Sequence, residues 1–320
     1  MAINFIKREE PQIRFLAVEK LNLLYNLFTT LLIIIFFNRL NDPQAMLLGR
    51  FFIAFATFAV IYVYTKFPSM ATRLLRVVSQ MALLSYWYPD TFEFNRIFPN
   101  LDHLFATLEF DLFGCQPALL FDQVCSGLFW REAFNMGYWL YYPMIALVSL
   151  YYFFCRPKEA ERCTFVIMAS FFLYYIIYIF LPVAGPQFYF PVIDPSLVAA
   201  GPYPEIYNYF DLHPEISIAQ AGEGGLFTHL VGMAQASGER PTAAFPSSHI
   251  GISTVIMLLA LRAKKSLALA LAPFYVLLCC ATVYIKAHYL VDAFAGVITG
   301  VLFYTLTAWI FDRYMAEKSA

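Results

Sequence analysis

The sequence predicts an all-α polytopic membrane protein, a helical bundle with about eight transmembrane helices. Composition is the first observation behind this prediction. Of the 320 residues 61% are hydrophobic and 13% are charged, whereas soluble domains are typically about 45–50% apolar and about 25% charged. The formal net charge of −1 leaves no basic surplus for the phosphates of a nucleic acid. The composition therefore excludes a disordered chain, a coiled coil, a small disulfide scaffold and a nucleic-acid-binding protein.

Apolar stretches of membrane-spanning length are the second observation. A bilayer core about 30 Å thick requires roughly 20 apolar residues in a helix. Eight stretches approach this length, although the second, third and sixth are short or carry charges at one end. The expected spans are approximately 18–38, 49–65, 72–89, 135–155, 163–182, 249–262, 266–286 and 288–311.

The distribution of Lys and Arg is the third observation, and it predicts the orientation in the membrane. With the N-terminus placed in the cytoplasm, fifteen of the 21 basic residues fall at cytoplasmic ends of spans and six fall on the opposite side. Cytoplasmic loops of membrane proteins carry an excess of Lys and Arg. We therefore expect a multi-pass integral membrane protein with both termini in the cytoplasm.

Two long segments then face the non-cytoplasmic side. The segment of about 90–134 indicates a helix lying in the membrane interface. Its apolar residues at helical spacing, with Asp102, Glu109 and Asp111 between them, are Leu101, Leu104, Phe105, Leu108 and Leu112. Cys115 and Cys125 share this segment, and the sequence leaves open whether they form a disulfide. The second segment, about 183–248, is a loop rich in Gly and Pro, and connections of this length are usually functional or disordered.

Polar residues that can carry chemistry gather at two places on the expected outer edge of the membrane. One is the stretch 238–249, which leads into the sixth expected span, and the other is 284–292, at the junction of the last two spans. Ionisable side chains at membrane depth are costly, so their presence indicates a functional site. We expect the two stretches to meet in one pocket.

Three residues of these stretches are the catalytic candidates. His288 and Asp292 are four residues apart at the start of a helix, so their side chains share a face. A carboxylate that binds one imidazole nitrogen leaves the other nitrogen free to attack. His249 stands at the start of a span, where an imidazolium can protonate a leaving oxygen.

Four further residues are candidates for binding a substrate phosphate. Arg240 offers the planar guanidinium that pairs with two phosphate oxygens. Ser247 and Ser248 stand at a helix N-terminus, where free N–H groups and the helix dipole favour an anion. Lys286 is the fourth, although Arg240 and Lys286 are also placed to anchor to lipid headgroups. For Lys286 we favour the headgroup interpretation.

The combination of a nucleophile, a proton donor and fixed positive charge suits phosphoryl transfer. No zinc-binding pattern of Cys or His occurs in the sequence, so we expect no metal and no cofactor. A pocket at the level of the lipid headgroups points to a lipid phosphoester as the substrate. A transporter is disfavoured, because transporters place ionisable groups near the bilayer midplane rather than at one edge.

At these two stretches the chain resembles the type 2 phosphatidic acid phosphatase superfamily of membrane lipid phosphatases and phosphotransferases. Arg240-Pro241, Pro246-Ser247-Ser248-His249 and His288-Tyr289-Leu290-Val291-Asp292 are similar to its first, second and third motifs. The resemblance implies that His288 is the phosphorylated nucleophile, Asp292 its orienter and His249 the general acid. It also implies that the third to eighth spans form the six-helix core of the superfamily.

Two motif positions differ from the common pattern of the superfamily. Met233 stands where the first motif carries a lysine, and Ala281-Thr282 stand where the third motif carries Ser-Arg. These differences look more like the inositol phosphorylceramide synthase branch, which the aromatic and proline-containing segment 181–189 also resembles. That branch implies a lipid phosphotransferase with a phosphohistidine intermediate. The alternative is a lipid phosphate phosphatase that hydrolyses phosphatidic acid or a polyprenyl phosphate with the same His-His-Asp set.

The sequence also suggests how the chain is divided and packed. We expect residues 1–134 to form N-terminal transmembrane helices with the interfacial segment, and residues 135–320 to form the catalytic transmembrane region, including the outer loop 183–248. Gly296 and Gly300 form a GxxxG pattern, which indicates close packing of two membrane helices. The oligomeric state does not follow from the sequence.

Overall fold

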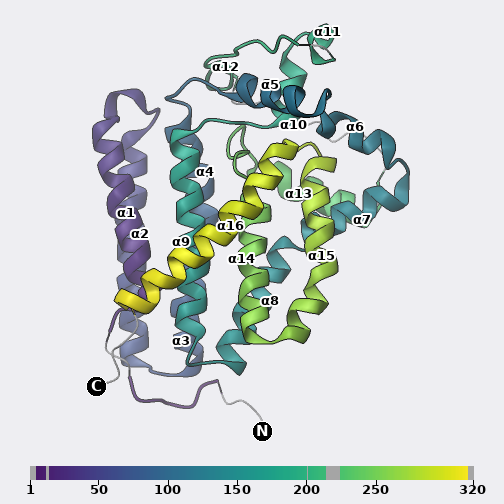
Figure 1. Cartoon of the computed structure of the whole chain (residues 1–320). Helices are drawn as coiled ribbons and strands as arrows, with labels where there is room; N and C mark the ends of the chain where they lie inside the picture. Colours follow the sequence, from purple (N-terminus) through teal and green to yellow (C-terminus); the bar gives the residue numbers. More distant parts are fainter. Residues whose placement is uncertain (1–4, 12–13, 200, 214–223, 316–320) are drawn as a thin grey trace.

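The computed structural model describes residues 5–11, 14–199, 201–213 and 224–315. Residues 214–223, which belong to the expected outer loop, therefore lie outside the described part. In the described residues every regular element is a helix and no strand is present. The long helices run side by side as a bundle, with shorter helices gathered at one end (Figure 1). The expected all-α helical membrane bundle is confirmed.

Each of the eight expected spans is helical in the structure. The helices that correspond to these spans are α1 (Ala17–Ile35), α2 (Pro43–Lys66), α3 (Met70–Ala82), α4 (Leu84–Asn95), α7 (Leu128–Trp139), α8 (Tyr141–Cys155), α9 (Ala160–Phe180), α14 (Ser248–Ala263), α15 (Lys265–Tyr284) and α16 (Leu290–Ile310). Among the described residues, five helices are long and apolar enough to cross a membrane. The number rises to seven if each of two bent helix pairs counts as one span.

The expected number of eight spans is thus higher than length and composition of the helices support. One reason is that α14 has only 16 residues. Another is that the third expected span is divided at Leu83 into α3 and α4. The helix α3 also contains the polar residues Arg76 and Gln80, both buried, and is therefore less apolar than a typical membrane span. The fourth expected span is the pair α7–α8, bent by 40°.

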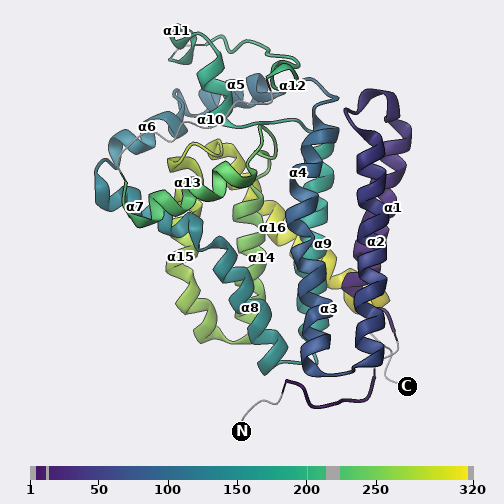
Figure 2. The same ribbon diagram turned by 180° about the vertical axis from the view of Figure 1, so that it is seen from behind.

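Helix α9 is the centre of the bundle. It contacts α1, α3, α4, α8, α14 and α16, and most of its residues are buried. Helices α1 and α2 pair on one side of it, beside α3 and α4, whereas α7, α8, α14 and α15 lie on the other side (Figure 2). The start of α1 and the end of α16 lie at the same end of the bundle. The other end carries the short helices, and this is where the two polar stretches meet.

The contact between α14 and α16 depends on the GxxxG pattern. A Cβ atom on Gly296 would lie 2.7 Å from the carbonyl oxygen of Ser247, and one on Gly300 would lie 2.6 Å from that of Gly251. No side chain fits at these distances, so the two helix backbones touch directly. In addition, the N–H of Ser247 donates to the carbonyl oxygen of Asp292 at 3.1 Å. The expectation of close packing is confirmed, and this packing joins the two polar stretches.

Replacing Gly300 with valine is expected to destabilise the protein. The new side chain would push α16 away from α14, and overpacking of this kind costs about 1–3 kcal/mol. Thermal unfolding in detergent measures the effect as a lower midpoint. Val301 on the same helix is 42% exposed, so Val301→Leu is the matched control. Equal midpoints for Gly300→Val and the control would contradict the packing argument.

Short helices form a cap over the end of the bundle where the polar stretches lie (Figure 1). These are α5 (Asp102–Phe113), α6 (Pro117–Val124), α10 (Pro186–Tyr189), α11 (Pro195–Val198), α12 (Tyr209–Leu212) and α13 (Leu226–Gly238), with the short turns Phe37–Arg39 and Phe190–Val192; Phe311–Met315 extends α16 at the opposite end. Helices α5 and α6 are bent by 60° relative to each other and together meet the criteria for a broken span or a re-entrant loop. The thiols of Cys115 and Cys125 are free in this structure.

The N-terminal helices contain a buried ion pair that the sequence did not reveal. From the sequence, Arg50 was expected at the outer end of its span. In the structure its side chain is only 3% exposed. It forms a two-fold hydrogen-bonded pair with Asp90 of α4, whose side chain is 8% exposed. The guanidinium also lies 5.1 Å from the ring centre of Trp87. A charge at this depth requires such a partner.

Candidate active site

His249 and His288 lie together at the capped end of the bundle. Their ring centres are 5.8 Å apart, which is close enough for both imidazoles to reach one phosphate group. His249 belongs to the first turn of α14, and its ring packs against Tyr138 and Tyr141 with ring centres 4.6 and 4.7 Å away. The ring nitrogens of His249 make no hydrogen bond to any described residue. They therefore remain able to exchange a proton with a ligand.

His288 is held in the turn between α15 and α16 by two backbone contacts. Its N–H donates to the carbonyl oxygen of Thr282 at 3.0 Å. Its Nδ1 lies 2.7 Å from the carbonyl oxygen of Ala244, and because a carbonyl only accepts, Nδ1 carries the proton. This tautomer leaves Nε2 as the unprotonated nitrogen with a free lone pair. Burial lowers the pKa of His288 to about 4, so the ring is neutral and nucleophilic at neutral pH.

Asp292 lies behind His288 but does not accept the main hydrogen bond from its ring. The distance from its Oδ2 to Nδ1 of His288 is 3.6 Å, too long for a hydrogen bond. Oδ2 instead accepts from the N–H of Tyr289 at 2.8 Å. Its Oδ1 is buried and has no partner among the described residues. The sequence analysis expected the carboxylate of Asp292 to fix the tautomer of His288. In the structure the carbonyl group of Ala244 makes that hydrogen bond instead.

The N-terminus of α14 is less open to an anion than the sequence suggests. Ser247 is the N-cap and accepts from the N–H of Ile250 at 3.4 Å. The N–H of Ser248 donates to the hydroxyl of Tyr178 at 3.0 Å, and this hydroxyl donates to the carbonyl of Pro246. Two of the first N–H groups are therefore already paired. Ser247 and Ser248 are both buried, and only Ser247 caps the helix with its side chain.

The two expected cations differ in their surroundings. Arg240 is exposed, and its guanidinium makes no hydrogen bond or ion pair with the described residues. Lys286 is instead paired with Asp122 of α6, at 2.8 Å between Nζ and Oδ2. This ion pair occupies the ammonium group of Lys286, which was a candidate for binding the substrate phosphate. Thr282, at a position where the superfamily motif has an arginine, is fully buried and brings no charge.

Two carboxylates of α5 support the turn that carries His288, and the sequence interpretation missed both. Glu109 accepts from the N–H groups of Leu290 and Val291 at 3.0 Å each, so it caps the start of α16. Asp102 accepts from the hydroxyl of Tyr289 and from the N–H groups of residues 184 and 185. Both side chains are fully buried. Their separation of seven residues, which places them on one helix face, was the signal available in the sequence.

Replacing Glu109 with alanine is expected to lower the catalytic rate about ten-fold with a smaller change in KM. The loss of a helix cap costs about 1 kcal/mol, and here it loosens the turn that presents Nε2 of His288. Glu109→Gln, which keeps one oxygen acceptor, should recover part of the rate. Asp111 is exposed on the same helix, so Asp111→Ala is the control. A higher KM without a change in the catalytic rate would contradict this positioning role.

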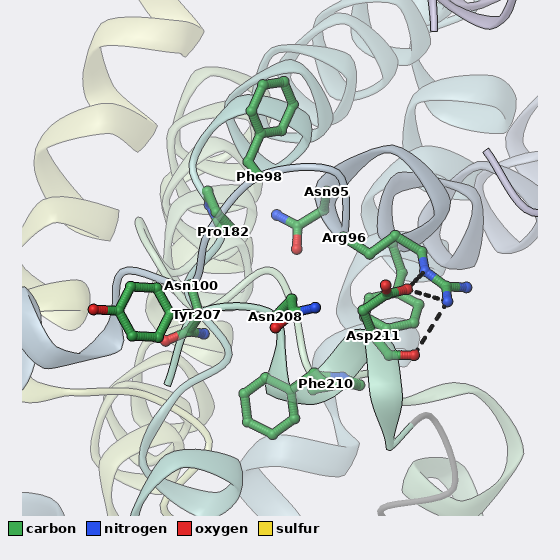
Figure 3. Close-up of a pocket in the computed structure, with 11 residues that line it drawn as sticks. Asn95, Arg96, Phe98, Asn100, Pro182, Tyr207, Asn208, Phe210 and Asp211 are labelled. Carbon is green, nitrogen blue, oxygen red and sulfur yellow. Dashed lines mark hydrogen bonds and ion pairs between the residues drawn. The ribbon is translucent and has the colours of Figure 1, made fainter. Parts of the chain in front are cut away.

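A pocket lies beside Pro241 at the same end of the molecule. The end of α4, the segment 207–211 and the chain after α9 line this pocket (Figure 3). Arg96 forms an ion pair with Asp211 there. Neither His249 nor His288 contributes to its lining. This pocket is therefore separate from the candidate active site, although the stretch 238–249 contributes Pro241 to the pocket and His249 to the site.

The fold and the site together define a class. The chain is a multi-pass membrane protein, and it gathers two histidines and a carboxylate at one end of its helical bundle. Comparison with known families agrees with this class: the model of the PAP2 superfamily matches residues 126–306. The chain belongs to the PAP2 superfamily, and it is a lipid enzyme of the phosphatase or phosphotransferase type. No curated protein matches the chain, and no solved structure does so.

Proposed function

We propose that this protein is a lipid phosphotransferase, similar to inositol phosphorylceramide synthase, that acts through a phosphohistidine at His288. The observation that carries the proposal is the arrangement of the two imidazoles. The ring centres of His249 and His288 are 5.8 Å apart, and the hydrogen bond from Nδ1 to the Ala244 carbonyl leaves Nε2 of His288 free. One nitrogen is thus prepared for attack, and a second imidazole is within reach of the same phosphate.

In the first step Nε2 of His288 attacks the phosphorus atom of a donor lipid. The P–N bond forms as the bond from phosphorus to the lipid alkoxide breaks, and His249 gives a proton to the departing oxygen. The anionic substrate supplies the negative charge that stabilises a protonated His249 in this buried position. Arg240, whose guanidinium is exposed and unpaired among the described residues, binds the phosphoryl oxygens.

In the second step the hydroxyl of an acceptor lipid attacks the phosphohistidine. Its oxygen forms a bond to phosphorus, its proton passes to His249, and the electron pair of the P–N bond returns to Nε2. Both imidazoles are then ready for another cycle. If the donor is a phosphomonoester and water takes the place of the acceptor, the same steps release free phosphate and the enzyme is a phosphatase. The donor and the acceptor together therefore distinguish the two activities.

The number of cations favours a phosphodiester donor and therefore transfer. A phosphodiester carries one negative charge, whereas a phosphomonoester carries up to two and needs more fixed positive charge around it. Here Thr282 replaces an arginine of the motif, and Lys286 is paired with Asp122. Arg240 remains as the one motif cation in the described residues. A site with one such cation suits a donor with one negative charge, such as a phospholipid with an alcohol headgroup.

We place the active site on the non-cytoplasmic face of the membrane and both termini in the cytoplasm. The excess of Lys and Arg at the expected cytoplasmic ends supports this orientation. The site lies at the bundle end opposite to the start of α1 and the end of α16. Substrates would therefore enter from the outer leaflet at the level of the headgroups.

Product analysis with purified protein in detergent or vesicles tests the proposal. One sample receives ceramide with phosphatidylinositol, and a parallel sample receives phosphatidic acid. The proposal expects an inositol phosphoceramide and diacylglycerol from the first sample, both formed through a phosphohistidine. Free phosphate from phosphatidic acid, with no phosphosphingolipid from the first sample, would establish the phosphatase instead.

A further inference from the structure

Glu239 is a buried carboxyl group that the proposed steps do not use. It follows α13 directly and precedes Arg240. Its Oε1 accepts from Nε2 of Gln187 at 3.0 Å, and the Oε1 of Gln187 in turn lies 3.5 Å from Nε2 of Gln235. The other carboxyl oxygen, Oε2, is shielded from solvent and has no partner among the described residues. Gln235 also lowers the pKa of Glu239 by a side-chain hydrogen bond. A buried oxygen without a partner is unfavourable, so Oε2 is available to a donor group of a ligand.

One hydrogen-bonded path and one electrostatic interaction connect Glu239 with residues that adjoin the catalytic pair. The N–H of Gln187, the residue that binds Oε1, donates to the carbonyl of Lys286 at 2.8 Å, two residues before His288. Glu239 also interacts electrostatically with Tyr138, and the ring of Tyr138 stacks on His249 at 4.6 Å. Glu239 is thus linked through Gln187 to the backbone of the turn that carries His288, and Tyr138 lies between it and His249.

The chemistry of the carboxyl group suits a hydroxyl partner. Burial raises the pKa of Glu239 to about 7, so near neutral pH both protonation states are populated. An alcohol hydroxyl both donates and accepts, so it can pair with either form. An ammonium group only donates and requires the charged form. A site that binds a hydroxyl through a buried polar group discriminates strongly against substrates that lack this hydroxyl.

We propose that Oε2 of Glu239 binds a hydroxyl group of the substrate beside the phosphohistidine site. The hydroxyl belongs either to the alcohol headgroup of the donor lipid or to the acceptor. This inference rests on the proposed function, since it assigns the recognition of a hydroxylated substrate to the same site.

The experiment compares wild-type protein with Glu239→Gln and Glu239→Ala in two measurements. The first is the rate of phosphoenzyme formation from phosphatidylinositol relative to that from phosphatidic acid, which has no headgroup hydroxyl. The second is the partition of the phosphoenzyme between ceramide and water. Glu205 is an exposed glutamate of the same end of the molecule, so Glu205→Gln is the control, and its two ratios should equal those of the wild type.

The proposal expects one of the two ratios to fall about ten- to one-hundred-fold in Glu239→Ala, the usual range for losing a hydrogen bond to an ionisable group. A fall in the first ratio assigns the hydroxyl to the donor, and a fall in the second assigns it to the acceptor. Unchanged ratios would overturn the proposal, whether or not the overall rate falls, because a structural role slows all substrates alike. If the wild type forms no phosphoenzyme, the proposed function itself fails, whereas unchanged ratios in an active protein refute only the role of Glu239.

Discussion

Replacing His288 with alanine is expected to reduce turnover of every lipid substrate by at least about a thousand-fold. The physical reason is that Nε2 of His288 forms the covalent bond to phosphorus, and no described neighbour offers an equivalent nitrogen in its place. His249 lies close by but packs between two tyrosine rings. We expect rapid quenching of the wild type to trap an acid-labile phosphoenzyme, and this species should be absent from the variant.

The control for this prediction is His229→Ala. His229 belongs to α13 and has no part in the proposed steps, so this variant should keep both activity and phosphoenzyme. Equal unfolding midpoints in detergent would show that both proteins are folded. A phosphoenzyme of normal amount in His288→Ala would mean that another residue is the nucleophile, and the proposed mechanism would be wrong.

Replacing His249 with alanine is expected to slow the reaction of natural lipids by roughly a hundred- to ten-thousand-fold, the usual contribution of a general acid. Departure of a lipid alkoxide needs a proton, because an alkoxide is strongly basic. A 4-nitrophenolate leaves without one. With a 4-nitrophenyl phosphodiester as donor, His249→Ala should therefore form the phosphoenzyme much closer to the wild-type rate than it does with a lipid donor.

The dependence on the leaving group separates acid catalysis from a loss of structure. Tyr141→Phe is a suitable comparison, because it keeps a ring against His249 and removes only a hydroxyl. It should slow both donors to a similar and smaller extent. If His249→Ala slowed the 4-nitrophenyl and the lipid donors equally, His249 would support the site without acting as the proton donor.

Much of the fold could be predicted from local patterns in the sequence. The apolar stretches predicted every long helix, because the length of an apolar run and the thickness of a bilayer are directly related. The pattern of Gly296 and Gly300 predicted close packing of the last span on another helix, and the structure identifies that helix as α14. The number of spans was harder to predict, since the division of α3 from α4 at Leu83 depends on packing and no marked change in composition accompanies it.

The site was predictable in part for a similar reason. His249, His288 and Asp292 stand out because polar residues are rare in this chain and fall at the ends of apolar helices. Lys286 shows the limit of that argument, because the sequence offered both a phosphate and a lipid headgroup as its partner, with the headgroup favoured, while the structure pairs it with Asp122. Its partner lies on α6, which no local pattern connects with the turn before α16.

Composition, apolar length and residue spacing were sufficient to define a helical membrane protein with two histidines and a carboxylate at one edge. Only the tertiary structure decided how those groups are held. The carbonyl of Ala244, 44 residues before His288, binds its Nδ1, and Glu109, 181 residues before Leu290, caps the helix that follows. The physical reason is that helix formation and membrane insertion depend on neighbours along the chain. Hydrogen bonds to a buried side chain depend instead on which distant segments pack around it.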